Sequence, residues 1–525
     1  MRTFRHGRSA AGALVAITLT LGALIIAQSI PGGFEGFWGS KYAPIATETP
    51  AASLLGATAT AIAEATRRAR PAPIDARSRL LRWNQIAIDA SGVDHTPVAP
   101  GESRVFGEQL GPGRASRAMA IVHIAIFDAV NAIYRRFEAY TRLEAGPPHA
   151  SVDAAIAQAA HDTLVALYPS QAPSFDTALA EDLEQIAARG KEEGLRLGQR
   201  AAALILADRA NDGSDDIDPR MGVEYLPGDE AGTWRQDPIS QIPIALGASW
   251  GEVRPFVIRS GRQFRVGPPP AMSSAAYAQA YNEVKRLGGD GITTPTERTP
   301  EQTDIGIFWA YDGTPSLCAP PRLYNQVTLT IADQMNTDFV DLTRLFALVN
   351  VAMADAGVAI WESKFYYQLW RPVTAIRESD PGTGLTGTGD GNAETLGDPT
   401  FSPLGAPASN LAGPNFTPPF PSYPSGHAGF GGALFEVLRQ FYGRDDIAFT
   451  FTSDEFNGET HDWTGAVRPW QPRHFTSLSQ AEEENGQSRI YLGIHWAFDK
   501  TEGITQGRRI ASYVVQHAFA ARRDQ

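Results

Sequence analysis

The chain has 525 residues, of which 43% are hydrophobic and 20% are charged, a composition typical of a globular protein with a large core. A formal net charge of −13 argues against nucleic acid as a partner. The single cysteine, Cys318, excludes an intramolecular disulfide and a cysteine-rich metal site, and we interpret it as a spectator thiol.

The first 29 residues have the charge and hydropathy pattern of a secretory signal peptide. Arg2, Arg5 and Arg8 precede an apolar run at about 10–26, and small residues follow at 27–29. The run is slightly shorter than the ~20 residues of a membrane-spanning helix, and an uncleaved membrane anchor is the alternative. We therefore expect export to the periplasm or the medium, or attachment to a membrane through this segment. No later stretch is expected to be long and apolar enough to cross a membrane.

The rest of the chain is predicted to be all-α, with two helical bundles joined by long loops. Residues 30–79 are rich in alanine, proline and threonine and are predicted to form a linker or a loosely packed arm. An N-terminal helical domain is predicted at 80–272. A C-terminal bundle that carries the active site is predicted at 273–525.

Helical periodicity defines the expected elements of both bundles. Residues 115–137 are apolar around most of the helix circumference, which predicts a buried helix. Residues 212–274 lose this periodicity and residues 373–420 are rich in glycine and proline, so both predict long connections. Further helices are predicted at 152–167, 175–208 with a break near Gly190, 274–287, 300–311, 321–336, 339–370, 426–442, 477–498 and 502–522.

The first segment with chemical information holds Lys364 and Arg371, seven residues apart in an apolar and aromatic stretch that Pro372 is expected to end. On a helix this spacing places the two cations two turns apart on one face. Two such cations repel each other unless an anion lies between them. A solvated basic face is the alternative, but the apolar surroundings favour a buried anion site.

The second segment is Ser425-Gly426-His427, at the start of a predicted helix. Unpaired backbone N–H groups and the positive end of the helix dipole favour an anion at such a position. A serine, a glycine amide and a histidine there can form an anion pocket. A helix N-cap by Ser425 beside a surface histidine explains the same residues equally well.

The third segment contains Arg489, His495 and Asp499. The histidine and the aspartate are four residues apart and are predicted to share a helix face, so that the carboxylate fixes the tautomer of the imidazole. The other ring nitrogen is then free as a ligand or a nucleophile. Arg489 adds a planar charged group suited to oxyanions. A structural His–Asp pair beside a surface arginine is the alternative.

The order and spacing of these segments resemble the superfamily of vanadium-dependent haloperoxidases and type-2 phosphatidic acid phosphatases. The matching pattern is K-x6-RP, PSGH and SR-x5-H-x3-D, and it spans residues 364–499. The segments that resemble the chloroperoxidase branch of the haloperoxidases are 308–313, 320–326, 343–349 and 361–364. The resemblance extends from about residue 300 to the end of the chain.

The resemblance implies a bound vanadate whose vanadium is coordinated by a ring nitrogen of His495. It further implies that His427 is the acid–base group, that Asp312 pairs with Arg489, and that Asp499 supports the vanadium-binding histidine. The groups implied to hold the vanadate oxygens are the side chains of Lys364, Arg371, Ser425, His427 and Arg489 and the Gly426 amide.

In the implied reaction hydrogen peroxide binds to vanadium, Lys364 polarises it, and a halide attacks it to give hypohalous acid. Vanadium stays in its +5 state, so the resemblance implies no haem. The catalytic residues implied by this scheme are Lys364, His427, His495 and Asp312. The resemblance also allows an organic acceptor for the halogen and a homo-oligomer.

The halide is interpreted from two aromatic residues near the motifs. Trp361 and Phe420 fall where chloroperoxidase-like members carry aromatic residues, which favours chloride or bromide and leaves iodide open. Alternatively, both rings only pack against the pocket wall.

Two other functions stay open at this point. An acid phosphatase would use the same residues, with His495 as the nucleophile and His427 as the proton donor to the leaving group. Trp361, Phe420 and the segment 308–313 favour a haloperoxidase instead. A non-catalytic phosphate-binding exported protein would need no acid–base histidine, yet His427 is present.

Overall fold

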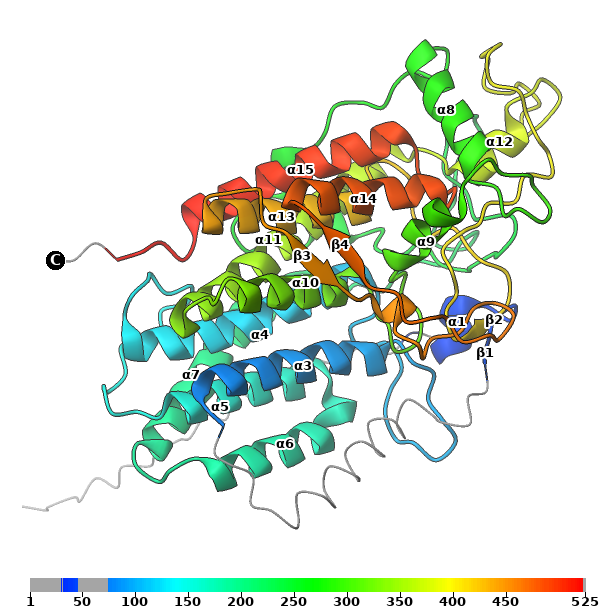
Figure 1. Ribbon diagram of the computed structural model, residues 1–525. Helices are drawn as coiled ribbons and strands as arrows, with labels where there is room; N and C mark the ends of the chain where they lie inside the picture. Colours follow the sequence, from blue (N-terminus) through cyan, green and yellow to red (C-terminus); the bar gives the residue numbers. More distant parts are fainter. Residues whose placement is uncertain (1–29, 31, 46–73, 523–525) are drawn as a thin grey trace, which may run out of the picture.

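The regular secondary structure is almost entirely helical, as the sequence predicted (Figure 1). The computed structural model describes residues 30, 32–45 and 74–522, and the predicted signal peptide or anchor at 1–29 lies outside them. The described residues contain fourteen α-helices, four 3-10 helices and four strands. The strands form two small antiparallel pairs, β1 (Ala43–Pro44) with β2 (Leu411–Ala412) and β3 (Phe449–Phe451) with β4 (Arg473–Phe475).

The first bundle is built around α4 (Gly111–Tyr134), which is buried over almost its whole length. Pro112 in its first turn has no N–H to leave unpaired, and Arg135 ends it in the left-handed region with a φ of 57°. The other helices of this bundle are α3 (Ala76–Asp94), α5 (Val152–Leu167), α6 (Ala172–Gln185) and α7 (Lys191–Arg209).

The second bundle is centred on α11 (Phe339–Tyr367), whose N-terminus is capped by Asp338 through a hydrogen bond from the Val340 N–H at 3.0 Å. Helix α11 packs against α4 as well as against its own bundle, so the apolar residues of both bundles form one continuous core. The predicted domain boundary at residue 273 stays a prediction. The other long helices of this half are α10 (Pro320–Gln334), α13 (Gly426–Tyr442), α14 (Leu478–Tyr491) and α15 (Ala497–His517).

Helices α4 and α11 are long and apolar enough to cross a membrane, contrary to the sequence expectation. Their most apolar windows are 94% and 100% buried inside the protein, respectively. Both are central helices of a bundle, and neighbouring helices cover their apolar surface. Core packing therefore accounts for their composition.

The contact between α13 and α15 is made by backbone against backbone. A Cβ on Gly507 of α15 would lie 2.0 Å from the Gly429 carbonyl oxygen of α13, and a Cβ on Gly503 would lie 2.7 Å from the Ser425 carbonyl oxygen. No side chain fits at these two positions, which is why they are glycine. The contact holds the start of α13, with its Ser425-Gly426-His427 segment, directly against α15.

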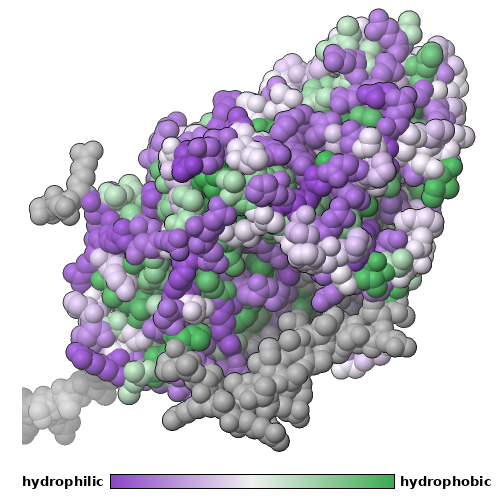
Figure 2. All heavy atoms as spheres, in the orientation of Figure 1, coloured by the Kyte–Doolittle hydropathy of each residue, from purple (hydrophilic) through white to green (hydrophobic). Residues whose placement is uncertain are grey.

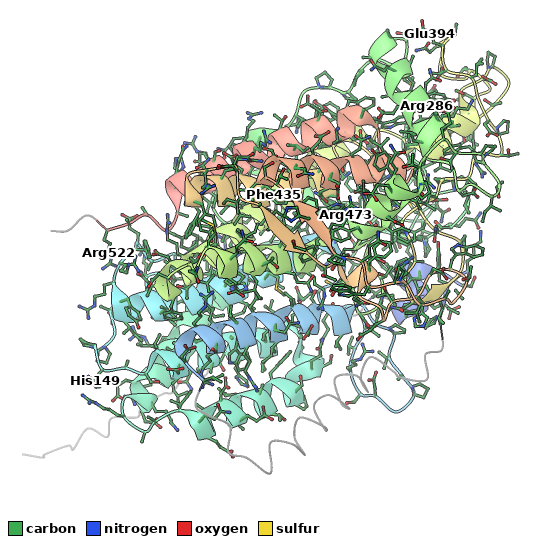
Figure 3. All side chains as sticks on the ribbon, in the orientation of Figure 1. His149, Arg286, Glu394, Phe435, Arg473 and Arg522 are labelled. Carbon is green, nitrogen blue, oxygen red and sulfur yellow. The ribbon has the colours of Figure 1, made fainter. Side chains whose placement is uncertain are left out.

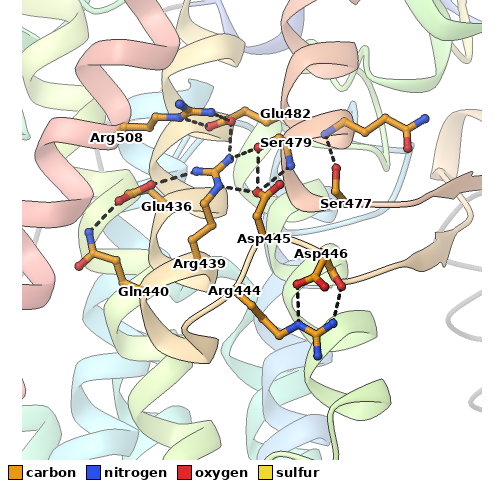
Figure 4. A network of polar contacts seen from close by, with 11 residues as sticks. Glu436, Arg439, Gln440, Arg444, Asp445, Asp446, Ser477, Ser479, Glu482 and Arg508 are labelled. Atoms are coloured by element: carbon orange, nitrogen blue, oxygen red, sulfur yellow. Dashed lines mark hydrogen bonds and ion pairs between the residues drawn. The ribbon is translucent and has the colours of Figure 1, made fainter.

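A network of ion pairs also joins α13, α14 and α15 (Figure 4). Arg439 of α13 donates from Nε to Asp445 Oδ1 at 2.7 Å and from Nη2 to Glu482 Oε2 of α14 at 2.5 Å. Arg508 of α15 donates from Nε to Glu482 Oε1 at 2.9 Å. Glu482 is buried, so the two arginines compensate the charge that its burial would leave unpaired.

Shorter helices and long loops gather at one end of the molecule, around α8 (Ala275–Leu287), α9 (Pro300–Phe308) and α12 (Pro372–Glu378) (Figure 1). Arg286 and Glu394 mark this end in Figure 3, whereas His149 and Arg522 lie at the other end. The 3-10 helices within the connections are η1 (Pro169–Gln171), η2 (Trp250–Glu252), η3 (Gly261–Phe264) and η4 (Asp454–Phe456).

The face of the molecule seen in Figure 2 is largely hydrophilic, with hydrophobic residues scattered over it. The most exposed large hydrophobic residues come from separate loops and include Leu226, Ile292, Leu396 and Trp470. Single exposed residues of this kind are normal on a globular surface.

The described residues 32–45, within the segment predicted as a linker or a loosely packed arm, are packed against the rest of the protein. Residues Gly33–Trp38 form helix α1, and Phe37 and Trp38 are only 4% and 1% exposed. The ring centroids of Trp38 and Phe416 are 5.0 Å apart, and β1 pairs with β2 nearby. Burial of these aromatic residues fixes the arm against the C-terminal half. Residues 46–73 lie outside the described part of the chain.

Several predicted helix boundaries shift by a few residues, and two predicted helices are wrong inside the motifs. The helix predicted at 339–370 ends at Tyr367, because Gln368 adopts a left-handed φ of 48°. The helix predicted at 477–498 is two helices, because the chain turns at Gly493 with a φ of 74° before α15 begins at Ala497. Both breaks fall inside the motifs described above and decide how their side chains meet.

Candidate active site

The three segments singled out in the sequence meet at one buried site. Lys364 lies in the last turn of α11, Arg371 directly before α12, and His495 two residues before the start of α15. Ser425 is the N-cap residue of α13, and Arg489 lies in the last turn of α14. All five side chains are buried.

Two of the predicted local geometries are wrong, although the residues do come together. Lys364 and Arg371 do not share a helix face, because α11 ends between them. His495 and Asp499 do not share a helix face either, because His495 precedes the first residue of α15. In both cases a change of chain direction, rather than a helix face, brings the side chains together.

The two cations of the first segment are held by backbone carbonyl groups. Lys364 Nζ donates to the carbonyl oxygens of Pro421 and Ser422, both at 2.9 Å. Arg371 Nε donates to the Phe420 carbonyl oxygen at 2.9 Å. Burial, reinforced by the neighbouring positive charge, lowers the pKa of Lys364 well below its usual value, and burial lowers that of Arg371 to about 9. A nearby anion would therefore favour the charged form of both groups.

His427 lies in the first turn of α13, next to Gly426. Its Nε2 lies 2.5 Å from the Ala310 carbonyl oxygen, which can only accept a hydrogen bond, so Nε2 carries the proton and Nδ1 is the unprotonated nitrogen of the neutral ring. Burial, followed by the charge of Arg489, lowers the pKa of His427 well below its usual value. The ring is therefore neutral and can accept a proton at Nδ1.

His495 has the opposite tautomer. Its Nδ1–H donates to Asp499 Oδ2 at 2.7 Å, and its Nε2 accepts from Arg371 Nη1 at 3.0 Å. Asp499 Oδ2 also accepts from the Trp496 N–H at 3.1 Å and from the Ser422 hydroxyl group. Burial lowers the pKa of His495 and raises that of Asp499 to about 6. A neutral imidazole with a fixed Nδ1–H presents the lone pair of Nε2.

Asp312 is the acidic partner of the second arginine. Arg489 Nη2 donates to Asp312 Oδ1 at 2.7 Å, which is the pairing that the resemblance implied. The same carboxylate oxygen lies 3.9 Å from His427 Nε2. Burial raises the pKa of Asp312, and the charge of Arg489 opposes this shift.

The donors of the site fit an oxyanion. Lys364, Arg371 and Arg489 can carry three positive charges, against the two carboxylates of Asp312 and Asp499. Among the described residues, Nη2 of Arg371 and Nε and Nη1 of Arg489 are buried without a hydrogen-bond partner. Buried N–H groups of charged side chains are costly when they stay unpaired. A tetrahedral anion beside them supplies both acceptors and negative charge.

The site opens into a cavity. Asp312, His427, Arg489 and His495 lie on its wall, together with Trp361 and Phe420, whose ring centroids are 4.8 Å apart. The N–H of Trp361 donates to the Leu246 carbonyl oxygen at 3.0 Å. The aromatic residues that the sequence singled out therefore border the cavity, with their ring surfaces rather than the indole N–H available.

Sequence reasoning missed several residues of the site and its cavity. Ser422 holds Asp499, and its only sequence signal is its place three residues before Ser425. Leu246 and Trp38 line the cavity from segments far away in the chain, and no motif points to them. Contacts made by carbonyl groups, such as that of Ala310, depend on the backbone path and have no residue-type signal.

Known proteins match both the sequence and the fold. Residues 344–524 match the family model described as VCPO second helical-bundle domain. The vanadium chloroperoxidase of Curvularia inaequalis is 31% identical over 503 residues, which cover 80% of this chain and 78% of that relative. The chain belongs to the vanadium-dependent haloperoxidase family.

Solved structures of vanadium-dependent haloperoxidases have the same fold. The structure of the first bacterial vanadium-dependent iodoperoxidase aligns with a TM-score of 0.66 and 23% identity, over 86% of this chain and 99% of that one. The holo form of a bacterial vanadium-dependent chloroperoxidase aligns with a TM-score of 0.57 and 15% identity, over 81% of this chain and 95% of that one. At these identities the likeness shows the fold of the haloperoxidases and does not distinguish between halides.

Proposed function

We propose that this haloperoxidase binds vanadate at His495 and oxidises a halide with hydrogen peroxide to hypohalous acid. The observation that carries the proposal is the buried excess of cationic N–H groups around Nε2 of His495. Arg371 and Arg489 have unpaired N–H groups there among the described residues, and an anion beside Lys364 would oppose the lowering of its pKa by burial. Vanadate supplies that anion and, when bound, a Lewis acid that activates peroxide.

The two histidines have different proposed roles. His495 offers Nε2 as the ligand atom, because Asp499 holds the proton on Nδ1. His427 takes a proton from incoming hydrogen peroxide on Nδ1 and returns it to the departing oxygen. Lys364 and the arginines hold negative oxygen atoms in a fixed, water-poor site, where their charge acts most strongly.

Chloride or bromide is the proposed halide, with iodide as the further option. Trp361 and Phe420 support this proposal, because their rings border the cavity near a cation: Lys364 Nζ lies 5.7 Å and 5.1 Å from the two ring centroids. Export stays part of the proposal and is supported by the pattern of residues 1–29.

The test compares protein loaded with orthovanadate and protein loaded with phosphate. We expect the vanadate form to consume peroxide in the presence of bromide, iodide or chloride, and the phosphate form to be inactive in all three. The same preparations are assayed on a phosphate ester, because the unprotonated Nε2 of His495 also suits a phosphatase nucleophile. Phosphate-ester cleavage without any halide oxidation would replace the haloperoxidase by the acid phosphatase.

A further inference from the structure

The short segment 310–312, between α9 and α10, holds two groups of the active site at once. The Ala310 carbonyl oxygen accepts from the Nε2–H of His427 at 2.5 Å, and the Asp312 carboxylate accepts from Arg489 Nη2 at 2.7 Å. Tyr311 lies between these two residues in the chain. Because peptide groups are planar, rotation about the backbone bonds of Tyr311 sets the direction of the Ala310 carbonyl group relative to Asp312. The conformation of Tyr311 therefore decides whether both contacts can form together.

The backbone of Tyr311 has an unusual conformation. Its φ is 39°, in the left-handed region that a bulky residue rarely adopts, because its Cβ crowds the following carbonyl oxygen there. A residue keeps such a conformation only when the surrounding structure holds it, and residues of this kind concentrate at functional sites. In this protein the strained residue joins two groups that contact the active site.

The hydroxyl group of Tyr311 ties the residue to two other elements. The side chain is fully buried, and its hydroxyl donates to Gln326 Oε1 of α10 at 3.1 Å and accepts from the Asp454 N–H of η4 at 2.6 Å. Gln326 Nε2 in turn donates to Asp454 Oδ2 at 3.0 Å. The three residues form a closed ring of hydrogen bonds, which fixes the direction of the tyrosine side chain.

This ring of hydrogen bonds is itself held by long helices. Arg322 of α10 donates from Nε to Asp454 Oδ2 at 2.7 Å and from Nη1 to Asp89 Oδ1 of α3 at 2.9 Å. Next to η4, the Ser453 hydroxyl donates to the Phe308 carbonyl oxygen at the end of α9 at 2.6 Å. Contacts from α3, α9 and α10 therefore hold η4, and the Tyr311 hydroxyl group transfers this rigidity to the segment 310–312.

Resting on the proposed role of His427, we propose that Tyr311 is a positioning residue for the acid–base histidine. Its hydroxyl group holds the left-handed backbone that keeps the Ala310 carbonyl oxygen on His427 while Asp312 pairs with Arg489. The carbonyl contact keeps the proton of His427 on Nε2, so that Nδ1 is the nitrogen that accepts a proton in the reaction. Without the hydroxyl group, the backbone at Tyr311 relaxes towards a negative φ and the Ala310 carbonyl group turns away from His427.

The test uses two variants that remove the hydrogen bonds and keep the packing. Tyr311→Phe removes the hydroxyl group, and Gln326→Met removes its acceptor from the side of α10. Tyr140→Phe is the matched control, because the Tyr140 hydroxyl donates to the Phe256 carbonyl oxygen at 2.8 Å in the first bundle. The Nε2–H resonance of His427 is followed by NMR on vanadate-free protein labelled with 15N-histidine. Orthovanadate titration, thermal unfolding, and kcat and KM in bromide oxidation complete the comparison.

We expect Tyr311→Phe to shift the Nε2–H resonance of His427 upfield or abolish it, because its hydrogen bond to Ala310 weakens. The kcat for bromide should fall about 10- to 100-fold, as for other residues that orient a functional group, while the KM for bromide and the vanadate affinity stay within about threefold. Gln326→Met should change the resonance and kcat in the same direction by a smaller factor, and Tyr140→Phe should change neither.

An unchanged His427 resonance in Tyr311→Phe would overturn the proposal, as would a fall in kcat that accompanies an equal loss of vanadate affinity or stability. The measurement in vanadate-free protein also separates this proposal from the proposed function. If the protein oxidises no halide, the haloperoxidase function fails, while the His427 resonance still decides whether Tyr311 positions this histidine.

Discussion

At the scale of single residues, two histidines of one site carry their protons on different nitrogens. An acceptor fixes each of them: Asp499 holds the Nδ1–H of His495, and the Ala310 carbonyl oxygen holds the Nε2–H of His427. The unprotonated nitrogen is therefore Nε2 in His495 and Nδ1 in His427. Two residues of the same type can therefore have different roles, His495 as a ligand and His427 as a proton acceptor.

The two histidines should respond differently to truncation. His427→Ala should retain vanadate within about tenfold and lose roughly 100- to 10,000-fold in turnover, the usual contribution of acid–base catalysis. His495→Ala should lose both vanadate binding and turnover, since it removes the ligand atom. Isothermal titration with orthovanadate and a bromide-oxidation assay separate the two losses. The exposed residue His149 provides the control His149→Ala, and turnover retained by His495→Ala would show that the assignment is wrong.

The Asp499 carboxylate, which holds His495, should also be important for vanadate binding. Asp499 accepts from His495 Nδ1, the Trp496 N–H and the Ser422 hydroxyl group. In Asp499→Asn an amide replaces one oxygen, and the proton is no longer held firmly on Nδ1. We expect vanadate affinity to fall about 10- to 100-fold, as for other residues that orient a metal ligand. Asp446→Asn, at an exposed aspartate, is the control in the same titration.

Residue identities were predictable at this scale, and their contacts only in part. Lys364, Arg371 and Arg489 are charged residues in apolar stretches of the sequence, and this unusual combination indicates an anion site. Ser422 and the carbonyl group of Ala310 have no such signal in the sequence. Their roles depend on the path of the backbone, which the residue types do not encode locally.

At the scale of elements, the start of α13 is positioned by its glycine contact with α15. The Gly507 position tolerates no Cβ, since the Gly429 carbonyl oxygen would lie 2.0 Å away. The backbone of one helix must move if a side chain is added. Such a movement is transmitted to Ser425, the N-cap residue of α13, and to His427 in its first turn.

Gly507→Ala should therefore affect both stability and the site. We expect a loss of roughly 1–3 kcal/mol in the free energy of unfolding, typical of overpacking, together with weaker vanadate binding. Thermal unfolding with and without orthovanadate measures both effects. The control is Gly267→Ala, at an exposed glycine whose added Cβ meets nothing within 4 Å. An unchanged melting temperature in Gly507→Ala would show that the helices can separate freely.

Most helices were predictable from periodicity, whereas the two breaks inside the motifs were not. The sequence around Gln368 favours a helix, and only the tertiary packing places this residue in the left-handed region. Gly493 is a visible break signal, but a single glycine in a helical pattern is often tolerated. The exact break decides where Arg371 and His495 point, so the site geometry could not follow from helix faces alone.

At the scale of the whole molecule, three buried carboxylates fasten loops to the helices. Asp94 accepts from the backbone N–H groups of 108–109, Asp128 from those of 140–141, and Asp355 from those of 256–258. Burial raises the pKa of all three to about 6, even though the amides favour the charged form. None of these long-range pairs could be predicted, because they join segments up to 99 residues apart.

The variant Asp355→Asn should show whether burial or the three backbone hydrogen bonds dominate the pKa of Asp355. A pKa raised from 3.8 to about 6 means that the folded protein binds the proton more tightly, so ionisation of Asp355 costs stability as the pH rises through this range. Relative to the variant, the free energy of unfolding of the unchanged protein should therefore fall by roughly 3 kcal/mol between about pH 4 and pH 6. Each pKa unit corresponds to about 1.4 kcal/mol. Urea unfolding at pH 4.5 and 7.5 measures the difference, with Asp341→Asn at the surface end of α11 as the control. If the advantage instead grows with pH, the three amide hydrogen bonds outweigh burial and the carboxylate is held in its charged form.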